Sequence, residues 1–132
     1  MIVAVWRVCA PTFNVDTFLD QFPDFEPDAV WRRGERRLLG ELHEDSGFNK
    51  TLGEAETSDE VLEQTHHALE KWRAELQALH TLAVSSVIDF GLFVGGRECF
   101  SQSLYFSSAA LQRLIELGVA LAVSAYPSSE EE

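Results

Sequence analysis

The sequence is poor in the residues that cross-link secreted proteins and in the apolar runs that cross membranes. Its only two cysteines, Cys9 and Cys99, stand far apart and indicate no disulfide framework. We expect both thiols to be reduced and buried, as free cysteines usually are in cytoplasmic proteins. No apolar run approaches the roughly 20 residues of a membrane helix, and residues 1–10 lack the layout of a secretion signal. A cytoplasmic protein without membrane contact is therefore predicted.

Motifs of established catalytic chemistry are also absent. No serine lies in a G-x-S-x-G turn, and neither cysteine has the electropositive surroundings of an activated thiol. His66 and His67 are adjacent, so on a helix they point about 100° apart and do not face one metal ion. The run His43, Glu44, Asp45 admits a metal or acid–base site, although three consecutive polar residues in a turn are more often simply solvated. We predict a protein that is not an enzyme and that holds no metal or cofactor.

Basic residues are scarce relative to acidic ones. Twenty-two Asp and Glu against ten Lys and Arg give a formal net charge of −12, and the isoelectric point is near 4.6. This charge repels phosphate backbones and anionic lipids, so nucleic acid is not an expected partner. The negative charge either serves solubility alone or suits a basic protein partner. In the second case it would increase the rate at which the two proteins associate. The acidic residues that we predict to contact such a partner are Glu54, Glu56, Asp59, Glu60 and Glu63.

The first third of the chain predicts a strand, a short helix and a turn-rich region. Ile2–Ala10 is rich in valine and ends before Pro11, as a strand would. Asn14 is a suitable N-cap for a helix whose apolar residues recur at helical spacing until Pro23. Residues 29–33 allow a second strand, and the turn residues within 34–53 indicate turns around short strands.

The second half predicts more regular elements. Thr57 and Glu60 have the spacing of a capping box, and an apolar stripe then predicts one helix to about Thr81. Residues 84–94 and 101–106 are β-rich and flank Gly95 and Gly96, which predicts an antiparallel hairpin. A last helix should begin at a Ser108 cap and end at a left-handed Gly118, before a closing strand over residues 119–126.

Together these elements predict one α+β domain over residues 1–127, with a disordered acidic tail over residues 128–132. The expected architecture is a ferredoxin-like or related two-layer sandwich, in which helices cover one face of a mostly antiparallel sheet. Trp6 and Trp72 fall on apolar stripes and are predicted core residues.

A candidate ligand groove surrounds Trp31, whose charged neighbours make it the one tryptophan suited to line a binding site. The four arginines near it either pair with neighbouring acids or form a recognition edge. The candidate groove residues are Trp31, Arg32, Gly34, Ser46, Gly47 and Phe48.

The motifs Trp-Arg-Arg-Gly at 31–34 and Ser-Gly-Phe at 46–48 precede the long helix, and Leu-Gly at 117–118 and Tyr-Pro at 126–127 follow it. In this order they resemble the bacterial domain-of-unknown-function family DUF4279 over nearly the whole chain. The pattern of that family favours Trp where this chain has Phe48. The resemblance implies a small bacterial cytoplasmic α+β domain and implies no catalytic residues.

Three functions remain open at this point. The leading hypothesis is a non-catalytic acidic binding protein, an immunity (antitoxin) protein that neutralises a bacterial toxin, with a basic toxin domain as partner. The alternative is a small-molecule-binding sensor or enzyme, with a pocket between the sheet and the loop from Trp31 to Phe48. Trp31, Arg32, His43 and Ser46 would line that pocket, and the arginine would hold an anionic ligand. The third is a homodimer built on an exposed sheet edge.

Overall fold

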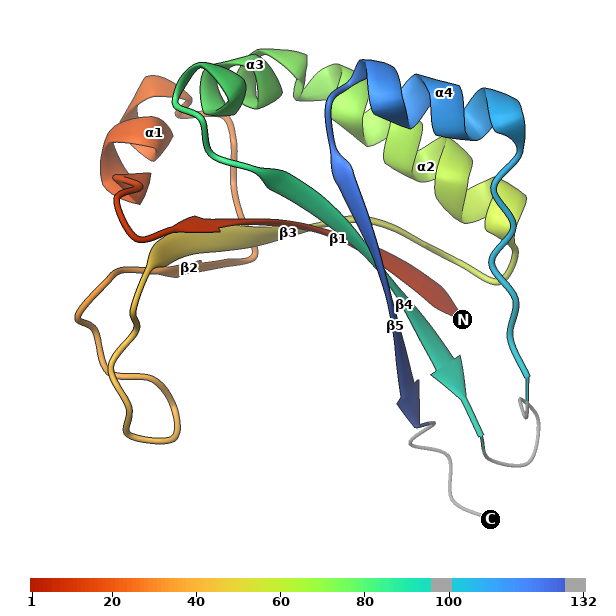
Figure 1. The fold of residues 1–132 in the computed structure, drawn as a ribbon, viewed down its shortest axis with the longest axis horizontal. Coiled ribbons are helices and arrows are strands. Elements are labelled where there is room, and N and C mark those ends of the chain that lie inside the picture. The colour runs from red at the N-terminus through yellow and green to blue at the C-terminus, as the bar shows by residue number, and fades with distance from the viewer. Residues whose placement is uncertain (96–100, 128–132) are drawn as a thin grey trace.

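The structure is a computed structural model in which residues 1–95 and 101–127 are described (Figure 1). Within these residues five strands form one sheet, in the order β2-β3-β1-β4-β5. The helices α1 to α4 all lie on one face of that sheet (Figure 1). The predicted α+β class is confirmed. The elements are β1 (Ile2–Ala10), α1 (Val15–Gln21), β2 (Ala29–Trp31), β3 (Ser46–Ala55), α2 (Ser58–Lys71), α3 (Arg73–Thr81), β4 (Ser86–Val94), α4 (Ser108–Glu116) and β5 (Ala120–Pro127).

The sheet is mixed, with β1 at its centre. β1 pairs antiparallel with both β3 and β4, and β2 pairs antiparallel with β3. β5 runs parallel to β4, because α4 carries the chain back across the sheet before β5 begins. The two edges of the sheet are therefore β2 and β5.

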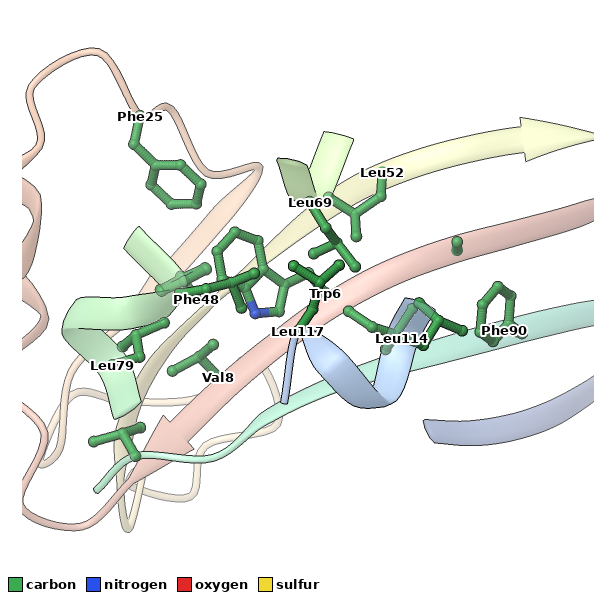
Figure 2. Packing of buried hydrophobic residues seen from close by; sticks show 14 of the residues in the cluster. Trp6, Val8, Phe25, Phe48, Leu52, Leu69, Leu79, Phe90, Leu114 and Leu117 are labelled. Carbon is green, nitrogen blue, oxygen red and sulfur yellow. The ribbon is translucent and has the colours of Figure 1, made fainter. Parts of the chain in front are cut away.

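Alternation along β1 decides which side of the sheet is buried. The even-numbered residues from Ile2 to Val8 are at most 1% exposed and share one face of the strand. Figure 2 shows Trp6 and Val8 of this face among the buried leucines of the helices. The Trp6 indole meets the rings of Phe25 and Phe48 edge-on, each with 5.4 Å between centroids. The core position predicted for Trp6 is confirmed. Leucines of α2, α3 and α4 close the core from the other side: Leu62, Leu69, Leu76, Leu79 and Leu114.

Two helices begin at the N-cap residues that were predicted from the sequence. At α1, the Oδ1 atom of Asn14 accepts a hydrogen bond from the backbone N of Thr17 at 3.0 Å. At α2, the Oγ1 atom of Thr57 accepts from the backbone N of Glu60 at 3.3 Å and donates to its Oε1 atom at 3.0 Å. These bonds satisfy backbone donors that have no partner inside the helix.

The long helix predicted to reach Thr81 is divided at Trp72. There the backbone adopts φ −101° and ψ 27°, outside the helical range, and α2 gives way to α3. The Trp72 ring meets the Phe25 ring edge-on with 5.0 Å between centroids. The break lets this ring lie over the core while the apolar stripe continues through Leu76 and Leu79, and no proline or glycine marks it in the sequence.

The predicted hairpin between residues 84–94 and 101–106 is wrong. Its first half is strand β4, but β4 pairs with β1 and β5, and residues 101–107 contain no strand. Instead the backbone N of Tyr105 donates to Ser58 Oγ at 2.8 Å, and the Phe106 ring packs edge-on against Phe90 at 5.3 Å. The apolar residues of this segment therefore pack on the core without joining the sheet. Gly96 lies outside the described residues.

The cap of α4 is displaced by one residue from its predicted place. The backbone N of Ala110 donates to Ser107 Oγ at 3.1 Å, so Ser107 and not Ser108 is the N-cap. Gly118 has φ +73°, which confirms the left-handed C-cap. The closing strand follows it directly.

The turns predicted over residues 34–53 end early, because Ser46–Ala55 forms the long strand β3. β1 pairs with one side of β3 and β2 with the other. This pairing outweighs the low strand propensity of Gly47, Asn49 and Gly53.

Cys9 contradicts the expectation of a buried thiol. It follows Val8 in β1 and so points to the face of the sheet opposite the helices, where it is exposed and free. Cys99 and the predicted disordered tail at 128–132 lie outside the described residues. No helix in the described ranges combines the length and the apolar composition needed to cross a bilayer.

Candidate functional site

The connection between β2 and β3, residues 32–45, is here named the arm. It extends away from the sheet on the side opposite the helices (Figure 1). The arm folds back on itself: Arg36 and Leu42 form an antiparallel bridge, and the backbone N of Gly34 donates to His43 O at 2.9 Å. Gly34 has φ +90°, a conformation that favours glycine, so this residue lets the arm turn away from β2.

A hollow of about 350 Å³ lies between the arm and the helix-free face of the sheet. The polar side chains of β1 face it because their neighbours Trp6 and Val8 are buried on the other side. The hollow is lined by Arg7 and Cys9 of β1, Trp31 of β2, and Arg37, His43, Glu44 and Asp45 of the arm.

Trp31 forms a wall of this hollow in a fixed orientation. Its Nε1 atom donates a hydrogen bond to Asp45 Oδ1 at 2.9 Å. Its ring also stacks on the His43 imidazole, with 6.0 Å between centroids and 21° between planes. These contacts leave the indole half-buried. The hollow thus presents an aromatic surface held in place by a carboxylate.

Arg7 and Cys9, the two residues of β1 in this hollow, each interact with a carboxylate. Arg7 Nη2 lies 3.3 Å from Asp89 Oδ2, and Ser124 Oγ donates to Asp89 Oδ1 at 2.9 Å. Although Cys9 is exposed as a residue, loss of part of the solvent around its sulfur raises the pKa of the thiol above its ordinary value, and the Asp45 carboxylate raises it further. At neutral pH the thiol is therefore protonated and a poor nucleophile.

The predicted groove residues do not form one site. Trp31 lines the hollow, whereas Arg32 binds the Asp16 carboxylate of α1 through Nε and Nη2, at 2.9 and 2.8 Å. This hydrogen bond lowers the pKa of Asp16 and raises the pKa of Arg32. Ser46 is buried, and its Oγ accepts from the backbone N of Arg33 at 2.9 Å. Arg32 and Ser46 line a separate, more open hollow of about 220 Å³ beside α1.

Gly47 and Phe48 belong to the sheet and core and not to a ligand groove. A Cβ on Gly47 would lie 2.1 Å from Val8 O and 2.8 Å from Cys9 Cβ, so glycine is needed for β3 to approach β1. Phe48 is fully buried, and its ring stacks on Phe18 with 5.6 Å between centroids. The reason for both corrections is that the strand begins at residue 46, two residues before the predicted loop ends.

The predicted partner-binding acids lie close together, from the end of β3 into α2. Glu63 Oε2 lies 3.7 Å from Arg113 Nη2, and Glu56 Oε1 lies 3.6 Å from the N-terminal ammonium. In the part of the chain that the structure describes, Glu54 and Asp59 have no ion pair. All five are exposed to solvent: Glu54, Glu56, Asp59, Glu60 and Glu63.

A groove of about 190 Å³ between α2 and α4 connects this acidic surface to apolar side chains. Asp59 and Glu63 border it, and Leu62 and Leu114 contribute apolar lining. His66 also lines the groove, and its buried Nδ1 atom has no hydrogen-bond partner among residues 1–95 and 101–127. Arg113 lines the groove as well and pairs with Glu63, so Asp59 is the bordering carboxylate that has no ion pair among residues 1–95 and 101–127. Apolar lining beside such a carboxylate is suited to the aliphatic stem and charged head of a lysine or arginine.

A comparison with protein-family models gives one match. The family described as Domain of unknown function (DUF4279) matches residues 3–128. The chain belongs to this family. The resemblance inferred from the short motifs is thereby confirmed. No curated protein and no solved structure matches the chain. Across the described part of this DUF4279 member, no group of three or more His, Cys, Asp or Glu is placed to hold a metal ion.

Sequence reasoning missed several residues that border the hollow beneath the arm and the groove between α2 and α4 in this DUF4279 member. Arg7 and Cys9 carried a usable signal, since period-two alternation in a strand with a buried Trp6 turns both to the opposite face. Leu114 and His66 carried none, because the sequence does not show that α2 and α4 lie side by side.

Proposed function

We propose that this chain is a non-catalytic, acidic protein-binding domain with a basic protein as its partner. The observation that supports this is the groove between α2 and α4, where Asp59 and Glu63 border the apolar side chains of Leu62 and Leu114. Arg113 already neutralises Glu63 in part, so Asp59 is the carboxylate that we expect to meet the partner's cation. A lysine or arginine of the partner suits such a groove, because its aliphatic stem packs on apolar surface while its charged head meets a carboxylate.

The charge of the whole chain supports the same partner class. A net charge of −12 attracts a basic protein over a distance and raises its association rate, by about 10- to 1,000-fold in strongly steered complexes. Glu54 and Glu56 extend the negative surface from the groove toward the end of β3. The groove then supplies the desolvated contacts that long-range attraction lacks.

The finer proposal is that the partner is a bacterial toxin domain with a basic active surface, which this chain neutralises in the cytoplasm as an immunity protein. An acidic domain that covers a basic catalytic surface blocks access of the substrate by occupancy alone. Such a function needs a complementary surface and no chemistry from the chain itself.

The test is a comparison of two doubly substituted variants in a pull-down from the native host at low ionic strength. Asp59→Asn with Glu63→Gln removes the two carboxylates that border the groove. Asp24→Asn with Glu26→Gln removes two exposed carboxylates elsewhere and changes the net charge equally. We expect a basic protein bound by the wild type to be lost from the first variant and retained by the second.

Identification of the bound protein then tests the finer proposal. If it is a toxin, co-expression of the wild-type chain should restore growth of cells that produce it, and the groove variant should fail to do so. Equal retention of the partner by both doubly substituted variants would contradict the groove as the binding site. An acidic partner, or none in any preparation, would contradict the proposed function.

A second candidate function is supported by the hollow beneath the arm. Trp31, fixed by Asp45, and the nearby Arg7 and Arg37 would hold a small anionic ligand with an aromatic or planar part. Thermal-shift screening against anionic metabolites and metal ions tests it, since a ligand at 100 times its dissociation constant stabilises by about 2.7 kcal/mol. A shift that Trp31→Leu abolishes would support this function, and no shift across the panel would contradict it.

A further inference from the structure

The edge strand β5 has none of the features that normally prevent an exposed strand from pairing. It is eight residues long, and its only partner among the described strands is β4. It contains no charged residue, and its single proline, Pro127, stands at its last position. Long, uncharged edge strands with unpaired backbone groups are templates for another strand.

Apolar side chains gather along this edge. Val123 is 56% exposed and Leu121 is 38% exposed. They stand in register with Phe90 and Ile88, which are fully buried on the helix side of the sheet. The apolar face that the helices cover at β4 therefore continues onto β5, where its side chains are exposed to solvent.

The helix above this edge adds to the apolar surface. Ile115 of α4 is 66% exposed. It stands two residues after Arg113, whose guanidinium reaches Glu63 of α2, and two residues correspond to about 200° around a helix. Ile115 therefore projects on the side of α4 away from α2, above the β5 side of the sheet.

We propose that a second copy of this chain pairs with β5 antiparallel, about a twofold axis at Val123, so that one sheet runs through both copies. In this register no two charged side chains lie opposite each other, and two β-branched valines meet on the axis. Val123 lies opposite itself, Leu121 opposite Ala125, Ala122 opposite Ser124, and Ala120 opposite Tyr126.

The absence of charge on β5 permits contact between copies at this edge. Each chain carries −12, so two copies repel wherever their acidic surfaces approach. β5 is an uncharged segment through which they can meet without opposing carboxylates. Because salt screens the remaining repulsion, dimer formation should strengthen as ionic strength rises.

The other edge explains why the assembly closes at two copies. β2 is only three residues long and leads directly into Arg32 and Arg33. It offers too few backbone groups for a further strand to add. An antiparallel β5 pair uses the free edge of both copies and therefore forms a closed, twofold dimer.

The first test is sedimentation velocity over a range of concentrations, with Val123→Lys and a matched control. We expect the wild type to reach twice the 14.8 kDa mass of one chain. Val123→Lys places two like charges opposite each other on the axis and should raise the dimer dissociation constant about tenfold or more. Leu82→Lys adds the same charge at a side chain that is also 56% exposed and should leave dimerisation unchanged.

The outcome of this test is unambiguous because the added lysine makes each chain less negative. General charge repulsion would fall in both variants, so a loss of dimer confined to Val123→Lys reports on the edge. Circular dichroism confirms that the variant is folded. A wild type that stays at 14.8 kDa throughout, or a dimer equally stable in both lysine variants, would overturn the proposal.

The second test does not perturb the strand and reads the register directly. In a background with Cys9→Ser and Cys99→Ser, we expect Val123→Cys to form an oxidised covalent dimer, because residues opposite in an antiparallel pair have Cβ atoms about 5 Å apart. Leu121→Cys should cross-link much more slowly, since it faces Ala125 of the other copy. Equal rates at both positions, or no cross-link at residue 123, would overturn this register and the interface with it.

Discussion

The two edges of the sheet contrast in how their strands are held. At one edge, β2 has three residues and is fixed by side chains on both sides of it. Thr51 N donates to Asp28 Oδ2 at 2.6 Å just before the strand, and Trp31 Nε1 donates to Asp45 at its end. At the other edge, β5 has eight residues and one side-chain hydrogen bond to β4, from Ser124 to Asp89.

The contrast shows two kinds of sheet edge. The edge at β2 is short and surrounded by polar contacts, which closes it to further strands, and we call it the closed edge. The edge at β5 is long and uncharged, and we call it the open edge. The first edge has a ladder too short to recruit a strand, and its polar contacts give it a single geometry. The second edge is regular and apolar, so it retains the capacity to extend the sheet. The arm occupies the closed edge, and we place the dimer contact at the open one.

The largest expected effect is at Gly47, which lies opposite Trp31 in β2 and Cys9 in β1. In Gly47→Ala the new Cβ would meet the Val8 carbonyl oxygen at 2.1 Å, so the backbone of two strands has to move apart. We expect the free energy of unfolding in urea to fall by about 3 kcal/mol.

Added volume at the open edge provides the control for Gly47→Ala. Ala125→Val enlarges an exposed side chain of β5 and should change the unfolding free energy by no more than about 0.5 kcal/mol in dilute solution. If both substitutions had equal effects, β5 would be packed as tightly as the interior contact between β3 and β1, and the description of β5 as an open edge would be wrong.

The next effect concerns the side-chain hydrogen bond that ties β5 to β4. Ser124→Ala leaves the buried Asp89 carboxylate with the Arg7 guanidinium as its remaining partner. Because the lost bond is made to a charged acceptor, we expect a loss of about 1.5 kcal/mol in unfolding free energy. A double-mutant cycle with Asp89→Ala should show most of this loss as coupling between the two residues. Additive effects would mean that the hydroxyl does not hold the strand.

A smaller effect is expected at the closed edge from Asp28. Burial opposes ionisation of this carboxyl, but the Thr51 hydrogen bonds and the Lys50 charge hold its pKa below the ordinary 3.8. Asp28→Ala should lower the unfolding free energy by about 1 kcal/mol at pH 7, since the carboxylate is exposed and partly screened. Urea unfolding of both proteins measures this difference.

The pH dependence of the same pair provides an independent check. The pKa of Asp28 is lower in the folded chain than in the unfolded one. Its contribution is therefore present above the unfolded pKa and is lost as pH falls through the folded pKa. The stability difference between wild type and Asp28→Ala should shrink as pH falls below about 4. A difference that stayed constant down to pH 2 would show that the ionised carboxylate is not responsible.

Strands at both edges were indicated by the sequence, whereas β3, which lies between β2 and β1, was not. The Val-rich and Ala-rich runs of β1 and β5 carry their own strand signal, and the Gly118 cap marks where β5 begins. β3 contains Gly47, Asn49 and Gly53, so local propensity indicates turns where long-range pairing makes a strand. The same limitation made residues 101–106 look like a strand, although Phe106 packs on the core instead.

The candidate sites divide in the same way. The acidic surface from Glu54 to Glu63 follows from the sequence, because consecutive charged residues on a helix and its preceding turn are exposed wherever the helix packs. The groove beside it was not predictable, because it depends on the contact between α2 and α4. The hollow was not predictable either, because it depends on the arm folding under β1. Phe48 was misplaced because a loop was predicted through residue 48, whereas β3 begins at Ser46 and turns Phe48 into the core.

The smallest expected effect on stability is at Arg32. It tests whether the ion pair between Arg32 and Asp16 contributes to holding the closed edge. Arg32 binds Asp16 through two nitrogen atoms, but both side chains are exposed, and exposed ion pairs contribute little to stability. We expect Arg32→Ala to leave the urea unfolding midpoint unchanged within error. The Asp16 pKa, measured by NMR titration, should nevertheless rise toward its ordinary value, because the guanidinium that lowers it is gone. If Arg32→Ala instead destabilised the chain as much as Asp28→Ala, the link between the arm and α1 would be what holds β2, and the edge would be fixed from the helix side.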